Sequence, residues 1–422
     1  MLSKTRSRKR FNDAVLVVGI DIGKERHVAV ADGPGGVVTK PLAVGNTLAD
    51  FEKLVTWIRQ VSSQLGTTEV IIGMEPTGHY WKPLGEWLQR HGFTLRLVSP
   101  VLTKRAKDML DGSPLKSDSK DAAVIAELIR QGYSRPISSQ QPVFQELRYL
   151  AEMRQRLVRE RTALLNRLHR LLDLLFPELV NLFCRLDIPT VLTLLTVAPT
   201  PVQVLALGRT ELIALLRRSS RGQLGEAKAE AILTAAHSSI ACQHGVQALL
   251  IDLQMLLPRI EELVRIRKEV EGRMAKALEQ VPYAEQLLSI PRLGRVTAAV
   301  ILGELGDLRL YRNARQVLKM AGLNLYEISS GKHQGDQRIT KRGRTQLRHM
   351  LYLAALRMFQ EGCPLHGLHQ KQSPLKPGPK VAVTGMRRLL KAIFAMVRDE
   401  QRFNHQQFEV RPTMQATTGL AA

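Results

Sequence analysis

The order of apolar runs in the first third of the chain constrains its fold more than any other feature. Residues 15–20, 27–31 and 37–41 are short runs rich in β-branched side chains, and the turn residues at 32–36 connect the second run to the third. These three runs predict consecutive strands that pair as a meander.

The next segment alternates between helical and strand patterns. Apolar periodicity predicts helices over 48–65 and 80–90, strands over 69–74 and 94–98, and a further helix that begins near Ser117. The strand over 94–98 is expected to be the last before the helix that begins near Ser117. Three consecutive strands followed by alternating helices and strands is the order of a ribonuclease-H-like domain, so we expect an α/β domain over residues 14–140.

Long helical periodicity begins at Val143. One predicted coiled-coil seam consists of leucines at 147, 150, 157, 164, 168, 171 and 175, and Arg154 and Arg161 interrupt it. A second seam runs over 249–274, where Pro258 should kink the helix. These seams predict a helical coiled-coil region over 141–280 with a helical insert over about 176–246. An antiparallel hairpin within one chain and a dimer contact remain alternatives.

A third, mostly helical domain is expected over residues 281–400. Its last amphipathic helix carries Met386, Leu389, Leu390, Ile393, Phe394 and Val397. Residues 1–13 form an expected basic N-terminal arm, and residues 401–422 an expected polar, disordered tail. The predicted fold class is therefore α/β plus α.

The charge balance indicates a polyanionic partner. The chain holds 61 Lys and Arg against 38 Asp and Glu, a formal net charge of +23, and nucleic acid is the leading candidate. Apolar runs such as 191–198 are too short to span a bilayer, so we expect a soluble protein with no membrane partner. Three widely spaced cysteines indicate neither a disulfide framework nor a zinc site, which favours a reducing cytoplasm.

Four acidic residues occupy positions at which an active site is expected. Asp21 and Glu75 each end a buried apolar run, where a carboxylate is costly unless a cation meets it. Asp118 and Asp121 are three residues apart at a predicted helix start, so both can face the same way. Each acid alone is more simply a surface charge, and Asp118 alone an N-cap, but their order along a ribonuclease-H-like pattern favours one cluster.

Such a cluster suits phosphodiester chemistry. Two Mg²⁺ ions about 4 Å apart can stabilise both the attacking and the leaving oxygen, and carboxylates are the hard ligands that Mg²⁺ requires. We therefore expect divalent metal, with Mn²⁺ as a substitute.

The third domain contains a second candidate site. Ser329, Ser330 and Gly331 lie in a loop that precedes a basic stretch. The expected phosphate ligands there are Lys332, Arg338, Lys341, Arg342 and Arg344. A loop serine is by itself usually only solvated, because a hydroxyl needs activation before it attacks phosphorus.

Residues 291–295, Pro-Arg-Leu-Gly-Arg, open a predicted helix and resemble the turn of a helix-hairpin-helix motif. Arg292 and Arg295 are therefore candidate ligands of backbone phosphate. An ordinary glycine turn between two helices is the alternative.

Taken together, these motifs resemble the DEDD insertion-sequence transposases, a family of bridge-RNA-guided recombinases with a RuvC-like domain and a C-terminal serine-bearing transposase domain. The N-terminal marks are the segments 19–24, 74–78 and 116–122, and the C-terminal marks are 321–324, 329–332 and 338–343. The resemblance covers roughly residues 14–400.

The resemblance implies roles for single residues and for partners. Asp21, Glu75, Asp118 and Asp121 would bind metal, and Ser330, immediately before the glycine, would attack DNA and become joined to it. It also implies dimers or tetramers in which the acids of one subunit serve the serine of another. The partners would be donor DNA, target DNA and a noncoding bridge RNA.

Two other functions compete with a transposase of an insertion sequence. A RuvC-like junction endonuclease would use water as its nucleophile and form no covalent adduct with DNA. A non-catalytic nucleic-acid-binding protein would need only the basic charge, and four placed carboxylates that repel phosphate speak against it.

Overall fold

The computed structural model describes residues 14–76, 78–110, 117–137, 141–326, 337–405 and 408. Contacts divide the chain into two compact units, Met1–Ser139 and Gln140–Ala422. The predicted N-terminal arm, Ser329, Ser330, Lys332 and most of the predicted tail lie outside the described residues.

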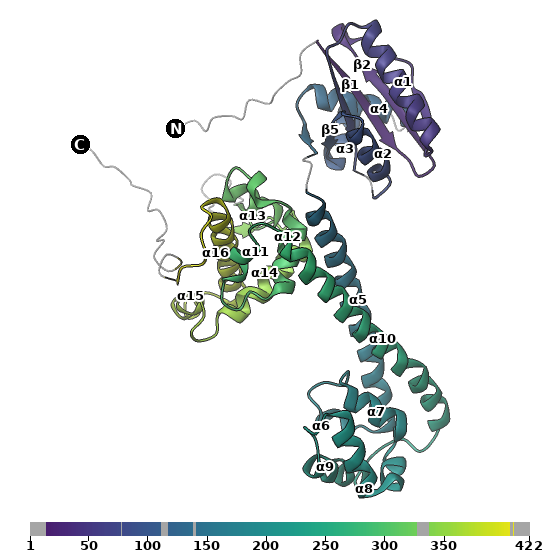
Figure 1. Ribbon diagram of the computed structural model, residues 1–422, viewed down its shortest axis with the longest axis vertical. Coiled ribbons are helices and arrows are strands. Elements are labelled where there is room, and N and C mark those ends of the chain that lie inside the picture. The colour runs from purple at the N-terminus through teal and green to yellow at the C-terminus, as the bar shows by residue number, and fades with distance from the viewer. Residues whose placement is uncertain are drawn as a thin grey trace, which may run out of the picture. The chain divides into compact units, whose positions relative to one another are not determined.

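The first unit is built on a six-stranded mixed sheet in the order β3-β2-β1-β4-β5-β6 (Figure 1). Strands β2 and β3 continue β1 as an antiparallel meander, β4 and β5 add in parallel on its other side, and β6 runs antiparallel to β5. The sheet is consistent with the predicted α/β fold, and β1, β2 and β3 form the predicted meander. The strands are β1 Val15–Ile22, β2 Arg26–Asp32, β3 Leu42–Gly45, β4 Glu69–Met74, β5 Thr94–Val98 and β6 Ser134–Pro136.

The predicted strand over 37–41 is wrong, because the third strand lies at Leu42–Gly45. Val37 and Val38 are 50% and 58% exposed, whereas Val44 is 1% exposed. Pro41 has no amide proton to donate to a ladder, so regular pairing begins only after it. The strand over 94–98 is the last before the helix at 118–130, as predicted. A further strand that the sequence did not predict, Ser134–Pro136, follows that helix and pairs with the strand over 94–98; three residues are too few to show an alternating pattern.

Helices cover both faces of this sheet. Leu16, Val18 and Ile20 point to the face covered by α1 Leu48–Gln64 and α2 Trp81–Arg90. Val15 and Val17 point to the opposite face, against α4 Asp118–Arg130. Successive strand residues face opposite sides, so one run of apolar residues supplies both cores. A helix that the sequence did not predict, α3 Pro100–Leu110, packs beside α4.

The second unit contains two long helices, α5 Pro142–Leu175 and α10 Val246–Glu279, that lie side by side (Figure 1). Arg154 near the start of α5 pairs with Glu271 near the end of α10 at 2.8 Å, and Arg167 pairs with Asp252. These pairs make the two helices antiparallel, which is the hairpin alternative. Pro258 lies inside α10, which continues on both sides of it.

The hairpin enters a separate core at each end. At one end the core includes Leu168 and Ile260 together with the helices of the insert, α6 Leu179–Leu182, α7 Pro189–Val197, α8 Pro201–Ser219 and α9 Glu226–His237. Arg161, one of the two breaks in the first seam, donates to the buried Asp187 of this insert at 2.7 Å.

At the other end, Phe144 and Met274 join a core formed by the C-terminal elements. The helices are α11 Ala284–Leu288, α12 Arg295–Leu305, α13 Ala314–Met320, α14 Thr345–Met358, α15 His366–Gln372 and α16 Gly378–Arg398, with the short strands β7 Leu325–Tyr326 and β8 Arg338–Ile339. The predicted last amphipathic helix is α16, and its predicted apolar residues are all buried.

All three cysteines are free, with Cys363 buried and the other two exposed. Within the described part of the chain, no single helix has the length and hydropathy of a membrane span, although α7 and α8 pass that test as a pair bent by 110°.

Candidate active site

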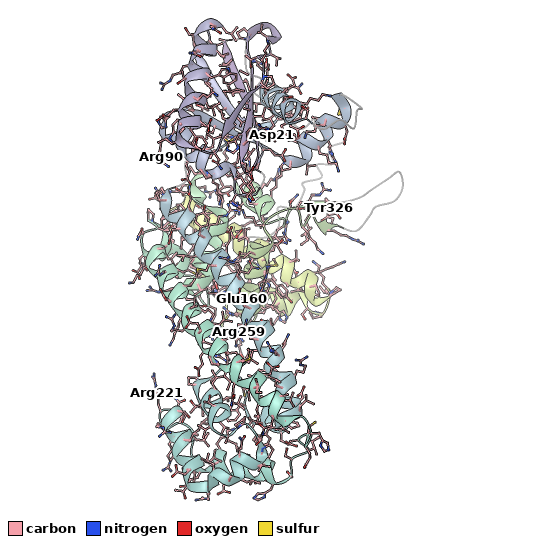
Figure 2. All side chains as sticks on the ribbon, turned by 90° about the vertical axis from the view of Figure 1, so that its right-hand side faces the viewer. Asp21, Arg90, Glu160, Arg221, Arg259 and Tyr326 are labelled. Atoms are coloured by element: carbon pink, nitrogen blue, oxygen red, sulfur yellow. The ribbon has the colours of Figure 1, made fainter. Side chains whose placement is uncertain are left out.

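Two of the four predicted acids lie at the carboxyl ends of two neighbouring central strands of the sheet in the first unit. Asp21, labelled in Figure 2, is the penultimate residue of β1. Glu75 directly follows the last residue of β4. The parallel ladder pairs Ile20 with Met74, so the two acids leave the ladder at the same level. Asp21 has the same strand parity as Val17, which places it on the face that α4 covers.

The other two acids begin the helix on that face. Asp118 is the first residue of α4 and Asp121 lies in its first turn, while Ser117 is the N-cap residue. The alternative that Asp118 is itself the N-cap is therefore wrong. Acidic side chains interact favourably with the positive end of the helix dipole, which lowers the cost of gathering them here.

The charges of the other three acids act on Asp21. The pKa of Asp21 is raised from 3.8 to about 6, first by burial and then by the charges of Asp121, Asp118 and Glu75. Each of these carboxylates disfavours the ionised form of Asp21, as like charges within a shared site do. The structure thus brings all four predicted acids into one electrostatic cluster.

Lys107 of α3 is a member of this cluster that sequence reasoning missed. Its Nζ lies 2.5 Å from Oδ2 of Asp121, and its charge acts to lower the pKa of Asp21. The available signal was the basic content of residues 104–107, Lys-Arg-Ala-Lys, shortly before the acidic helix start. It was missed because α3 itself was not predicted.

The donor chemistry of the cluster fits a hard divalent cation. All four side chains offer carboxylate oxygens, the ligands that Mg²⁺ takes. As the side chains stand, no three His, Cys, Asp or Glu of the described segments are gathered closely enough to ligate one ion. Binding would therefore require side-chain movement, including release of Asp121 from Lys107.

Arg130 fixes the far end of α4 to the sheet. Its Nε lies 2.5 Å from Oδ2 of Asp32, and its Nη2 donates to the carbonyl oxygen of Asp32 at 2.5 Å and to that of Val15 at 3.4 Å. One guanidinium thus bridges the end of β2 and the start of β1. The helix that begins with Asp118 and Asp121 is therefore anchored to the sheet at its C-terminal end.

Ser330, Ser329 and Lys332 lie outside the described residues, but the segments on either side of them are described. Strand β7 pairs with β8, and Oγ1 of Thr340 donates to Oδ1 of Asn324 at 2.7 Å. Glycines 322 and 343 meet just beyond, where a Cβ on Gly343 would lie 2.4 Å from the amide nitrogen of Gly322. The pairing of β7 with β8 therefore brings together the residues on either side of the segment that contains the predicted nucleophile.

The predicted phosphate ligands after that segment differ in exposure. Arg338, Lys341 and Arg342 are exposed. Arg344 is mostly buried, its Nη1 lies 3.4 Å from Oε2 of the buried Glu304, and burial lowers its pKa. Arg344 thus contributes to holding α14 on α12 through a buried ion pair.

Arg292 lies in the connection between α11 and α12, and Arg295 is the first residue of α12. Both are exposed, Arg292 has a positive φ of 66°, and Arg295 pairs with Glu279 at 2.8 Å. Gly294 is the N-cap residue of α12. The predicted turn is therefore present, and its phosphate contact stays a prediction.

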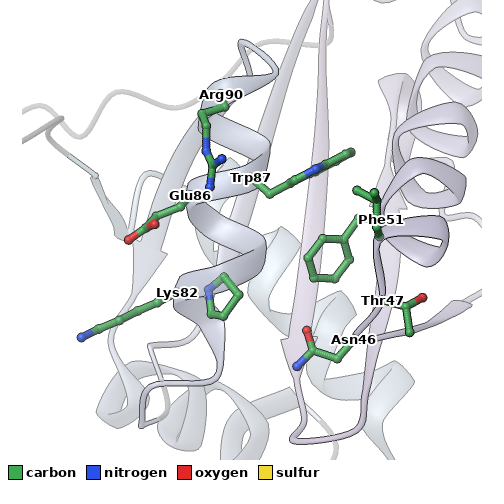
Figure 3. Close-up of a pocket in the computed structure, with 9 residues that line it drawn as sticks. Asn46, Thr47, Phe51, Lys82, Glu86, Trp87 and Arg90 are labelled. Carbon is green, nitrogen blue, oxygen red and sulfur yellow. The ribbon is translucent and has the colours of Figure 1, made fainter.

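A separate hollow of about 490 Å³ lies between α1 and α2 (Figure 3). Phe51 and Trp87 line it with ring centroids 5.6 Å apart, beside Lys82, Glu86 and Arg90. These helices cover the sheet face opposite α4, and none of the predicted site residues lines the hollow.

Comparison with known proteins connects both halves of the chain to transposases. Residues 18–177 match a DEDD transposase model of the IS110 type, and residues 284–364 match the transposase IS116/IS110/IS902 family.

Two relatives span nearly the whole chain. The insertion element IS110 uncharacterized 43.6 kDa protein of Streptomyces coelicolor is 26% identical, over 92% of this chain and 95% of its own. The insertion element IS116 uncharacterized 44.8 kDa protein of Streptomyces clavuligerus has the same identity and the same two coverages.

Among solved structures, Thermus thermophilus RuvC in complex with Holliday junction substrate aligns with 29% of this chain and 99% of its own, at 15% identity. The TM-score is 0.23, too low to support a conclusion. The two transposase models, matched in order over more than half of the residues, show that this chain belongs to the IS110-type DEDD transposases and is a DNA transposase or recombinase.

Proposed function

We propose that this transposase of an insertion sequence cuts and rejoins DNA strands with a divalent-metal site made of Asp21, Glu75, Asp118 and Asp121, and with Ser330 as nucleophile. The observation that carries the proposal is the convergence of the four acids around Asp21. In this proposal residues 14–140 supply the metal site, 141–280 contribute to assembly, and 281–400 supply the serine.

The acids would hold Mg²⁺, as two ions, with Mn²⁺ as a substitute. Bound metal would offset the negative charge of the phosphate and help to activate the attacking hydroxyl. The raised pKa of Asp21 supports this role, because a cation between the carboxylates would offset both the burial of the Asp21 charge, which is the main cause of the shift, and the repulsion from the neighbouring acids.

The serine would exchange one phosphodiester for another. Oγ of Ser330 attacks phosphorus and loses its proton, while a deoxyribose oxygen leaves and takes up a proton. A hydroxyl of the strand to be joined then attacks the phosphoserine ester, which forms the new DNA bond and regenerates Ser330. No oxidant, reductant or nucleotide is consumed, because each step makes one ester and breaks one.

Nucleic acid would bind through the basic surface of the second unit. Arg338, Lys341 and Arg342 are exposed within five residues of one another. We propose donor and target DNA as substrates and a bridge RNA as their guide, since the charge excess accompanies no conventional base-reading helix in the part of the chain that the structure describes. Assembly as a dimer or tetramer is part of the same proposal.

A covalent adduct between protein and DNA tests the nucleophile. Each variant is incubated with end-labelled DNA of the element and Mg²⁺, then denatured, and protein-linked label is measured. Wild-type protein and Ser329→Ala should form the adduct, and Ser330→Ala should bind DNA without forming it. Adduct from Ser330→Ala but not from Ser329→Ala would assign the nucleophile to Ser329.

The same experiment tests the alternative of a RuvC-like junction endonuclease. That enzyme would cleave with water, so cleaved DNA without protein-linked label in wild-type protein would favour it over the serine mechanism.

Dependence on RNA is tested separately. Protein purified from cells that carry the complete element should copurify with a specific RNA, and RNase treatment should abolish site-specific recombination. Undiminished recombination after RNase treatment would show that no RNA guide is needed.

A further inference from the structure

Two glycines face each other beneath the helix that carries half of the acidic cluster. Gly19 of β1 pairs with Gly73 of β4 in the parallel ladder, on the face that α4 covers. A Cβ on Gly19 would lie 2.1 Å from the carbonyl oxygen of Ala122 and 2.6 Å from the amide nitrogen of Ala126. The backbone of α4 therefore rests directly on the backbone of the sheet.

The contact at Gly73 is of a different kind. A Cβ there would lie 1.6 Å from Cδ1 of Ile129 and 3.5 Å from Cγ2 of Ile125. Here the close neighbours are side-chain atoms of α4 rather than its backbone. The two glycines thus set the distance between helix and sheet through one contact with the helix backbone and one with the fully buried side chain of Ile129.

The glycine pair lies next to the acids in both elements. Gly19 is two residues before Asp21, and Ala122, whose carbonyl oxygen Gly19 meets, directly follows Asp121. Because α4 is rigid and Arg130 ties its last turn to the sheet, a side chain at Gly19 would lift the first turn. Ordinary van der Waals contact would require a shift of about 1 Å, enough to impair a catalytic arrangement.

We propose that Gly19 and Gly73 are positioning residues of the metal site, because they set the depth at which α4 presents Asp118 and Asp121 to Asp21 and Glu75. This inference rests on the proposed metal site. It predicts that metal affinity, and not only stability, depends on the absence of side chains at these two positions.

The test measures Mn²⁺ binding without DNA, by the loss of the free-ion signal in electron paramagnetic resonance, beside circular dichroism melting. Gly73→Ala should fold and bind Mn²⁺ at least about tenfold more weakly, as changes behind metal ligands commonly do. The double variant Gly73→Ala with Ile129→Val lacks the clashing Cδ1, so its affinity should return towards that of Ile129→Val alone. Gly272→Ala, a glycine of α10 with no other atom near its missing Cβ, is the matched control and should bind like wild type.

Gly19→Ala should lose more affinity than Gly73→Ala, and Ile129→Val should not restore it, because the clash at Gly19 is with backbone atoms. If folded Gly73→Ala binds Mn²⁺ like wild type, or if Ile129→Val fails to restore it, the inference is overturned. Asp21→Asn and Asp118→Asn separate this result from failure of the metal site itself. If both acid variants bind Mn²⁺ as tightly as wild type, the metal site itself is refuted. If the acid variants lose Mn²⁺ affinity but the glycine variants keep it, only the positioning role is refuted.

Discussion

The Nζ of Lys107 lies 2.5 Å from Oδ2 of Asp121, so a lysine from one helix contacts an acid that the proposed metal would also need. The lysine side chain is 34% exposed and that of the aspartate 13%. The ammonium would therefore compete with a divalent cation for the same oxygen.

Replacing Lys107 with Met should make Mn²⁺ bind more tightly, because the ion no longer displaces an ammonium group. A partly exposed ion pair is worth up to about 1 kcal/mol, which corresponds to about a fivefold change in dissociation constant. Without metal the variant should melt at a lower temperature, since Asp121 loses its partner. Lys104→Met, an exposed lysine of the same helix, is the control; weaker Mn²⁺ binding by Lys107→Met would mean that the lysine supports the metal instead.

The pKa of Asp21 predicts how the stability of the metal-free protein varies with pH. Its folded-state pKa is about 6 against an ordinary value of 3.8, so the folded state holds the proton more tightly. The resulting stabilisation is complete below about pH 4 and is lost as the pH rises through 6. In EDTA, Asp21→Asn should therefore raise the melting temperature relative to wild type at pH 7.5, and this advantage should disappear near pH 4. If the gain in melting temperature of Asp21→Asn over wild type instead grew as the pH fell, the pKa of Asp21 would be lowered by folding rather than raised.

Protonation of Asp21 should also weaken the binding of metal. Below about pH 6 a proton competes for Asp21, so the affinity of wild-type protein for Mn²⁺ should fall there faster than that of Asp21→Asn. Titration with Mn²⁺ between pH 5 and 8 measures this, and parallel curves for the two proteins would exclude Asp21 as the titrating group.

Arg130 should be important for the stability of the first unit. Its side chain is 17% exposed and that of its partner Asp32 is 9% exposed, so Arg130→Met leaves an almost buried carboxylate without its cation. The expected loss in the free energy of unfolding is about 3 kcal/mol. Arg398→Met, which breaks an exposed pair with Asp399, should cost less than about 0.5 kcal/mol. Equal losses in urea unfolding would show that burial of the pair does not matter.

Replacing Arg338, Lys341 and Arg342 together with Ala should weaken DNA binding and its dependence on salt. All three are exposed, and each phosphate contact removed should make the slope of log affinity against log salt less negative by about 0.9.

The control for this variant removes an equal charge from arginines already paired with glutamate: Arg209, Arg265 and Arg273. An equal change in slope for both variants would indicate only a general effect of net charge. Fluorescence anisotropy between 50 and 300 mM salt, about the range in which phosphate contacts dominate, makes the measurement.

The sequence by itself determined much of the element order of the first unit, though not α3 or β6, and it singled out the four acids as candidates. Apolar runs such as residues 15–20 and 70–74 mark buried strands, and an acid that ends such a run is conspicuous because burial penalises its charge. Local patterns of this kind depend on a few neighbouring residues, so they can be read without the fold. The same reasoning failed at Val37 and Val38, because the prediction gave their β-branched side chains more weight than the missing amide proton of Pro41.

Only the tertiary structure decided which groups meet. The pairing of Lys107 with Asp121, the contact of Gly19 with the backbone of Ala122, and the choice of an antiparallel hairpin for α5 and α10 all join residues from different elements. Such contacts depend on the spacing between helix and sheet, or on the register of two helices. Those quantities follow from the packing of whole cores and leave no periodic trace in either segment alone.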